Sequence, residues 1–237
     1  DDITVLSATC DCITADDLEQ EKVDLLMAEP FYHQMQNHQI ATSLSFWYKR
    51  TYLDDMLNKE TGVVIPSKGF IRCVAVEWKK LMQSHGKAGT VSGFDHSQFD
   101  QIQEEWHEHE YTYPLWMYDY KQLTDVFTLG TLDFDQTIHS LQNVLQVPFT
   151  EKGTCHAVIM WMDYNLFNQV TVSNEPMAPR NNSNNNMDSA DGIGKSYWKV
   201  TIKFLKEGVQ VNEQCKLEAS FSLEHETAAS RFDFRVL

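Results

Sequence analysis

The 237-residue sequence has few of the features that mark secreted, membrane or metal-binding proteins. Its five cysteines form no CxxC pair, and no histidine pair is spaced to complete a zinc site. We therefore expect no metal centre and a reduced chain in the cytoplasm and nucleus. No apolar stretch approaches the ~20 residues that a membrane span needs, and the acidic start Asp1-Asp2 argues against a signal peptide.

Positive charge and phosphate-binding motifs are also scarce. Nineteen Lys and Arg residues stand against 34 Asp and Glu residues, and the net charge of -15 repels phosphate backbones and anionic lipid over a Debye length. Neither GxGxxG nor GxxxxGK occurs, so no phosphate-cradling loop is predicted. We expect no nucleic acid and no membrane among the partners. The negative charge fits either simple solubility or the attraction of arginine-rich proteins.

The first quarter of the chain has the pattern of a parallel sheet that begins in mid-fold. Residues Ile3–Ser7 and Val23–Glu29 contain short apolar runs that are typical of buried parallel strands. A parallel sheet needs a crossover helix between its strands, and none precedes these two runs. We therefore interpret residues 1–62 as the remnant of a larger α/β domain.

A helix and a β domain are predicted next. Apolar residues recur at helical spacing from Ile40 to Met56, which predicts an amphipathic helix that starts near Asn37, ends before Gly62 and packs on the sheet remnant. From Val63 onward the apolar period changes to two. Residues 63–237 are therefore predicted to form a β domain.

Alternation of apolar and polar residues is clearest in the last part of the chain. One face of a predicted strand carries Trp198, Val200, Ile202 and Phe204. The same pattern recurs in residues 217–223 and 232–236, as expected for half-buried antiparallel strands of a sandwich or barrel. The run 157–162 is apolar on both faces, which predicts a central strand. The predicted fold class is α/β plus β.

Two segments interrupt the β pattern. Between Gly93 and Pro114 lies a polar, helical-looking insertion. Its apolar stripe consists of Phe94, Phe99, Ile102 and Trp106. Such a stripe on a projecting element either belongs to a satellite core, which is a small hydrophobic cluster apart from the main core, or forms a surface that docks on another module. From about 175 to 195 the chain is rich in Asn, Pro and Ser, which predicts a mobile loop.

Few residues offer catalytic chemistry. Glu29 follows a predicted strand, at the edge where open α/β sheets bind ligands, but a role in capping or ion pairing fits equally well. His107 and His109 are two apart, whereas residues on one helix face are three or four apart, so we predict no zinc motif there. No grouping of Ser, His and Asp can be argued from spacing, so nucleophilic catalysis is not expected.

Several motifs resemble the arginine methyltransferases, in particular the second, carboxyl-terminal module of the tandem members. They are Leu25–Tyr32 for the acidic loop, Phe46–Thr51 for the helix after it, Gly93–Asp95 for the start of the dimerisation arm, Pro114–Trp116 for its exit, His156–Tyr164 for a barrel strand and Tyr197–Lys199 for the Thr-His-Trp loop. The order and spacing of these motifs together are specific.

The resemblance implies a partial Rossmann-like methyltransferase lobe at residues 1–62, followed at 63–237 by an antiparallel β-barrel with a helical dimerisation arm at about 93–114. Active members hold the substrate guanidinium between two glutamates of one loop. Glu29 matches the first glutamate, and no Glu lies between it and Phe46. The Thr-His-Trp loop reads Ser196-Tyr197-Trp198 and lacks its histidine. We expect the Gly-rich turn that carries S-adenosylmethionine to lie upstream of Asp1.

The resemblance therefore implies a catalytically inactive module that binds no S-adenosylmethionine itself. In the family, two modules pair through the arm of one and the Rossmann-like lobe of the other. The expected partner is the amino-terminal methyltransferase module of the same protein, and the apolar stripe of the insertion is expected to carry part of the contact. The parent protein would use S-adenosylmethionine to methylate arginine in histones and other basic proteins.

Two other readings remain open from the sequence. In the first, the chain is a fragment of an active methyltransferase module that uses Glu29. In the second, it is an aromatic-rich β module that binds carbohydrate or peptide, and all of its strands pair antiparallel.

Overall fold

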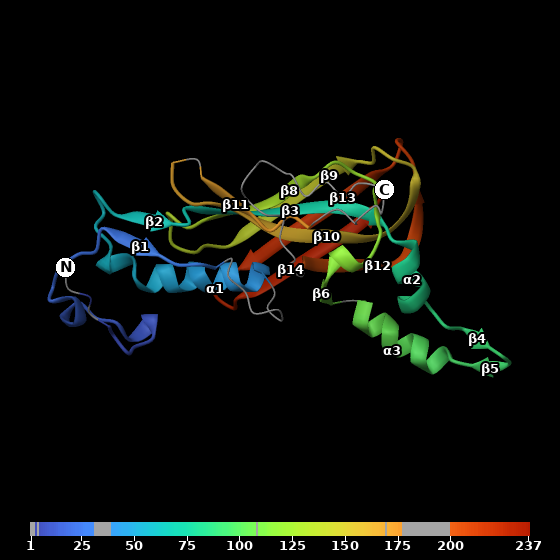
Figure 1. The fold of residues 1–237 in the computed structure, drawn as a ribbon, viewed down its shortest axis with the longest axis horizontal. Helices are drawn as coiled ribbons and strands as arrows, with labels where there is room; N and C mark the ends of the chain where they lie inside the picture. Colours follow the sequence, from blue (N-terminus) through green and yellow to red (C-terminus); the bar gives the residue numbers. More distant parts are fainter. Residues whose placement is uncertain (1–2, 4, 31–38, 108, 169, 177–199) are drawn as a thin grey trace.

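The computed structural model describes residues 3, 5–30, 39–107, 109–168, 170–176 and 200–237 (Figure 1). These residues form two antiparallel sheets that share a core, with one long helix beside them, a small parallel ladder at one end and a projecting arm at the other. Within this part of the chain, no helix combines the length and the apolarity required to cross a membrane.

The larger sheet has seven strands. Its main path runs β6-β12-β10-β3-β7, while β11 pairs with β10 and β8 pairs with β3. The strands are β3 (Lys68–Glu77), β6 (Glu110–Tyr113), β7 (Lys121–Gln122), β8 (Phe127–Asp133), β10 (Gly153–Asn165), β11 (Thr171–Ser173) and β12 (Val200–Val211). The smaller sheet has the order β14-β13-β9 and consists of β9 (Leu141–Pro148), β13 (Lys216–Glu224) and β14 (Ala229–Val236).

The two sheets do not close into the predicted barrel, so the barrel part of the expected fold class is not observed among the described strands. β9 pairs with β13 along its length, and no backbone ladder joins it to β8 in the described residues. Instead, the Asn143 side-chain amide of β9 donates to the Leu129 carbonyl of β8 at 3.1 Å. The sheets are therefore held together by side-chain packing, with Phe221 of β13 among the shared core residues.

The central strands are covered on both faces, as their apolar pattern predicted. In β10, Val158 and Met160 pack into the core between the sheets, whereas Ile159 and Trp161 pack into a second core on the opposite face. All four are buried. Cys73 of β3 belongs to the first core, and burial raises the pKa of its thiol.

The alternation predicted for the late strands is confirmed where the structure describes it. Val200, Ile202 and Phe204 lie together in the second core, while Trp198 lies outside the described residues. The inward residues of β13 and β14 are Leu217, Ala219, Phe221, Leu223, Phe232 and Phe234, and all of them are buried between the sheets. Period-two patterning therefore assigned these faces correctly.

The prediction of a buried strand at Ile3–Ser7 is wrong for its described residues. The described residues of the Ile3–Ser7 segment form no strand, and Ile3 and Val5 are almost fully exposed. β1 (Leu25–Met27) is a strand, but its parallel partner is β2 (Val63–Ile65), with Leu25 opposite Val63. Because the described ladder has only these two strands, the side chains of Leu25 and Met27 face solvent instead of a buried sheet.

The amphipathic helix ends earlier than predicted, and its apolar side enters a core that the two sheets share with residues of β1 and β2. α1 spans Gln39–Tyr52, and the 3-10 helix η3 (Asp54–Met56) replaces its expected last turns. Trp47 lies in the core between the sheets, and its indole N–H donates to the Gln136 carbonyl at 2.8 Å. Ser43 and Tyr164 of β10 share a buried hydrogen bond of 2.7 Å. The helix is therefore packed on the β layers through Trp47 and Ser43.

The insertion is a mixed element. Between Gly93 and Pro114 it contains β5 (Phe94–Asp95) and α3 (Ser97–His107), and it returns to the large sheet through β6. The segment before it contains α2 (Lys79–His85) and β4 (Thr90–Val91), which pairs with β5. The remaining 3-10 helices are η1 (Cys10–Cys12), η2 (Asp16–Leu18) and η4 (Leu115–Met117). Of the loop predicted at about 175–195, residues 177–195 lie outside the described part.

Candidate module interface

The arm, defined as residues 86–109, begins with a tight β-hairpin. Val91 of β4 pairs with Phe94 of β5, so Ser92 and Gly93 form a two-residue turn. Both residues have positive φ angles, 51° and 84°, as the primed hairpin turns require. This geometry leaves Val91 and Phe94 at the tip of a projecting ribbon (Figure 1).

Polar contacts fix α3 to the hairpin. Asp95 caps the start of α3, where its carboxylate accepts the Ser97 N–H at 2.9 Å and the Ser97 hydroxyl at 3.0 Å. These two bonds lower the pKa of Asp95. Asp100 is buried, and its carboxylate accepts the N–H groups of Ala88 at 2.7 Å and Gly89 at 2.9 Å. The helix and the hairpin are therefore held as one unit by carboxylates that bind backbone donors.

The apolar residues predicted for the stripe are exposed wherever the structure describes them. Phe94 is 72% exposed, Phe99 53% and Ile102 54%. Phe99 and Ile102 are three residues apart and share one face of α3, whereas Asp100 faces the hairpin. The side chain of Trp106 lies outside the described ones. Of the two readings of the stripe, satellite core is wrong for these three residues, and a docking surface remains.

The return of the arm is anchored on the large sheet. β6 pairs antiparallel with β12, where Tyr111 lies opposite Ile202. Lys203 of β12 forms an ion pair with Glu110 at 3.2 Å, and both side chains are partly buried. The arm therefore projects from a rigid base, which favours a fixed presentation of its exposed face.

Glu29 lies two residues beyond the end of β1, and its side chain is exposed. β1 and the arm occupy opposite ends of the long axis (Figure 1). The structure therefore does not bring Glu29 and the arm stripe together. The predicted loop Ser196-Tyr197-Trp198 lies outside the described residues.

The sequence reasoning missed the hairpin and the role of Asp100. A weaker signal was present, because the dipeptide Ser92-Gly93 marks a turn or loop. No local signal marks Asp100, since its partners precede it by 11 and 12 residues and are backbone groups.

Comparison with protein families matches residues 68–236 to the arginine methyltransferase oligomerization subdomain. The matched region contains both antiparallel sheets and the arm, and it starts where β3 starts. The family was expected from the motifs, and this match confirms it.

Curated relatives share this similarity at the level of sequence. The chain is 30% identical over 232 residues to protein arginine N-methyltransferase 7 of Oryza sativa subsp. japonica, which covers 93% of this chain and 30% of that protein. It is 31% identical over 219 residues to protein arginine N-methyltransferase 7 of Mus musculus, covering 86% and 29%. The chain therefore spans about a third of the length of these relatives.

A solved structure shares the fold. A chain of the Trypanosoma brucei PRMT1 enzyme-prozyme heterotetrameric complex with AdoHcy superposes with a TM-score of 0.62, covering 99% of this chain and 73% of that chain. The sequence identity is 13%, so this likeness concerns the fold alone.

Proposed function

Because this chain belongs to the arginine methyltransferase family, we propose that it is a catalytically inactive, carboxyl-terminal module of a tandem enzyme. Its role is to act as the pseudo-dimer partner of the active amino-terminal module of the same protein. One observation carries this proposal. The apolar residues Phe94, Phe99 and Ile102 of the arm are exposed, and they lie in the region that matches the family's oligomerization subdomain.

Burial of the arm face supplies a favourable free energy of association. Full burial of a Phe or Ile side chain contributes ~1.5–3 kcal/mol. Phe94, Phe99 and Ile102 are at least half exposed, so covering each of them on binding would contribute about 1 to 2 kcal/mol. The rigid attachment of α3 through Asp100 limits the conformational entropy lost on docking.

The chemistry of arginine methylation requires groups that this chain lacks in sequence. Two carboxylates neutralise and orient a planar guanidinium through bidentate hydrogen bonds, and the loop after β1 offers Glu29 alone. A single exposed carboxylate leaves the cation free to swing, and misplacement by about 1 Å can lower a rate about a hundredfold. We propose that S-adenosylmethionine binds the amino-terminal module and not this chain, which contains no GxGxxG motif.

The substrate assignment follows from the family and the charge. We propose that the parent protein methylates arginine in histones and other basic proteins. The net charge of -15 supports this because it attracts arginine-rich segments at low ionic strength. Free cysteines in the described structure are compatible with the proposed cytoplasmic and nuclear location.

Our proposal predicts that the chain neither binds S-adenosylmethionine nor transfers a methyl group. The active-fragment hypothesis, with Glu29 as the working carboxylate, predicts both. Calorimetric titration of the chain with S-adenosylmethionine should give no heat of binding, and a histone peptide should take up no radioactive methyl group from the cofactor. Micromolar binding together with methyl transfer would replace our proposal by the active-fragment reading. The carbohydrate- or peptide-binding reading predicts antiparallel pairing only, and the parallel ladder of β1 and β2 argues against it.

The pairing role is tested by placing charge on the arm face. The double variant Phe99→Glu with Ile102→Glu should bind the amino-terminal module at least thirtyfold more weakly, because two apolar contacts of about 1 kcal/mol each are lost and two charges are desolvated. Phe167→Glu is the matched control, since Phe167 is 50% exposed and lies outside the arm. Unchanged affinity of the double variant in surface plasmon resonance would refute the docking surface.

A further inference from the structure

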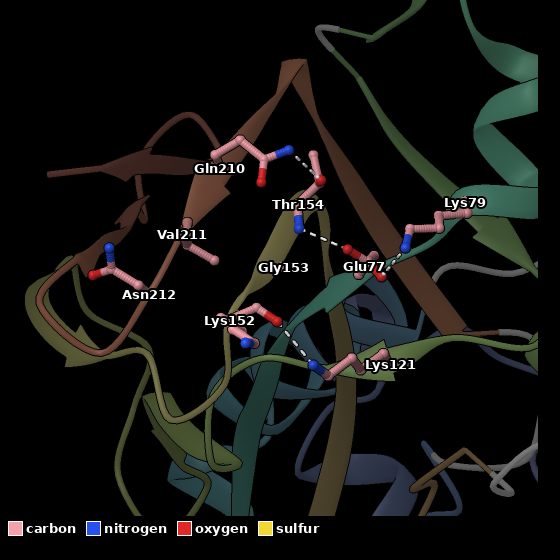
Figure 2. Close-up of a pocket in the computed structure, with 9 residues that line it drawn as sticks. All are labelled: Glu77, Lys79, Lys121, Lys152, Gly153, Thr154, Gln210, Val211 and Asn212. Atoms are coloured by element: carbon pink, nitrogen blue, oxygen red, sulfur yellow. Dashed lines mark hydrogen bonds and ion pairs between the residues drawn. The ribbon is translucent and has the colours of Figure 1, made fainter.

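A polar hollow lies where the ends of several strands of the large sheet meet (Figure 2). Its volume is about 760 Å³. The lining residues are Glu77, Lys79, Lys121, Lys152, Gly153, Thr154, Gln210, Val211 and Asn212. They come from the end of β3, the start of α2, β7, the start of β10 and the end of β12. None of them belongs to the arm face or to the loop after β1.

The lining is basic although the chain is acidic. Three lysines surround the hollow against one glutamate, whereas the whole chain has 19 Lys and Arg residues against 34 Asp and Glu. The lysines lie far apart in sequence, at positions 79, 121 and 152. Only the antiparallel pairing of β3 with β7 and β10 brings them to one place.

Glu77 serves as part of the floor of the hollow. Its Oε2 accepts the Thr154 N–H at 2.7 Å, and its Oε1 pairs with Lys79 at 3.0 Å. The Thr154 N–H, with help from Lys79, holds the pKa of Glu77 below its usual range. Gln210 donates to the Thr154 hydroxyl at 2.7 Å and joins β12 to the same network (Figure 2). The one carboxylate of the lining is thus occupied by internal partners.

Lys121 and Lys152 form an exposed rim. The Lys121 ammonium donates to the Lys152 carbonyl at 2.8 Å and pairs with Glu151 at 3.1 Å. Lys121 is 45% and Glu151 57% exposed, and an ion pair between two exposed side chains is weak because water screens it. A ligand with higher charge density can therefore displace Glu151 from Lys121 at small cost.

We propose that this hollow binds a small polyanion, a molecule that carries two or more phosphate or carboxylate groups. One exposed lysine binds a singly charged anion only weakly. Binding therefore requires that two or three ammonium groups contact the same ligand. The polar, open lining disfavours apolar ligands, which need enclosed apolar pockets. An acidic protein would cover a larger area and would be repelled by the net negative charge of the whole chain. A small anion is screened by salt from charges beyond ~8–10 Å.

Calorimetric titration of the full chain tests the ligand class. Pyrophosphate, citrate or both should bind, and each bound ligand should bind more tightly than orthophosphate and more weakly as salt is raised. Binding of pyrophosphate alone identifies phosphate as the preferred group, and binding of citrate alone identifies carboxylate. Equal binding of orthophosphate, binding of a poly-glutamate peptide only, or no binding at millimolar concentration would overturn the proposal.

Substitution of the rim locates the site. The double variant Lys121→Gln with Lys152→Gln should bind the polyanion roughly five- to thirtyfold more weakly, from about 0.5 to 1 kcal/mol for each lost contact. Lys68→Gln is the matched control, because Lys68 is 42% exposed, pairs with Asp133, and lies at the opposite end of β3 from Glu77. The charge-conserving variant with arginine at both positions should retain binding. Unchanged affinity in the glutamine variant would place the anion elsewhere and refute this site. The result does not depend on whether the module pairs through its arm.

Discussion

Removal of the Asp100 carboxylate should loosen the arm without unfolding the body of the module. Asp100 is buried in the arm and accepts two backbone N–H groups, from Ala88 at 2.7 Å and from Gly89 at 2.9 Å. Both of these partners lie within the arm. Replacement by alanine removes the acceptor and keeps the helix-forming character of the position.

The magnitude follows from the two hydrogen bonds. A hydrogen bond to a charged group contributes ~1.5–3 kcal/mol when its loss leaves a buried donor unsatisfied. The donors of Ala88 and Gly89 are only partly buried, so water recovers part of this energy. We expect Asp100→Ala to lower the free energy of arm opening by about 2 to 4 kcal/mol, which corresponds to about thirtyfold to a thousandfold in the opening equilibrium.

Hydrogen exchange of single amides is the appropriate assay. The amides of Ala88 and Gly89 should exchange faster by that factor in Asp100→Ala, whereas the amide of Ile159 in β10 should keep its protection. Gln98→Ala changes an exposed residue of the same helix and should leave all three rates unchanged. Equal exchange at Ala88 and Gly89 in the wild type and Asp100→Ala would show that the carboxylate does not hold the arm.

Three further predictions concern the body of the module. Gly208→Ala should lower the unfolding free energy by about 1 to 3 kcal/mol in urea titration, because the added Cβ would lie 2.8 Å from a Thr154 methyl carbon and 3.0 Å from the His156 ring. The Nδ1 atom of His156 accepts a hydrogen bond from the backbone N–H of Trp78 at 2.8 Å, and burial lowers the pKa of His156. The stability that the neutral ring contributes should therefore be complete above about pH 6.5, and it should fall as the pH decreases from there toward the folded-state pKa. The variant His156→Gln should reduce this dependence of the unfolding free energy on pH, measured by urea titration at different pH values. Arg50→Met should cost about 2 to 4 kcal/mol in thermal or urea unfolding, since the buried guanidinium donates to two backbone carbonyls and pairs with a carboxylate; an unchanged midpoint would contradict this.

Strand faces were predictable because they depend on a local property of the chain. Successive side chains of a strand point to opposite sides, so the alternation in 200–204 and 217–223 reported which residues would be buried. The doubly apolar run 157–162 likewise predicted a strand covered on both faces. The exposed stripe of the arm was identified from spacing, but its alternatives, satellite core and docking surface, were separated only by the observed exposure of Phe99 and Ile102.

Pairing partners were not predictable from the same patterns. The apolar run 3–7 has the composition of a strand, yet its described residues are not paired. β1 pairs with β2, which lies 38 residues later, because the chain returns after α1 along the same edge. Closure of the barrel also depends on pairing partners. In the described part of the chain, β9 forms its ladder with β13, and the Asn143 side chain bonds to the Leu129 carbonyl of β8.

The amino-acid sequence by itself determined the family, the β character of residues after 63 and the apolar residues of the arm, because motif order and periodicity are properties of neighbouring residues. Tertiary structure alone decided that α1 packs on the β layers, that Asp100 fastens α3 to the hairpin, and that Lys79, Lys121 and Lys152 meet around one hollow. These contacts join residues that are distant in sequence, and hydrogen-bond partners and charge clusters of that kind leave no periodic trace in the chain.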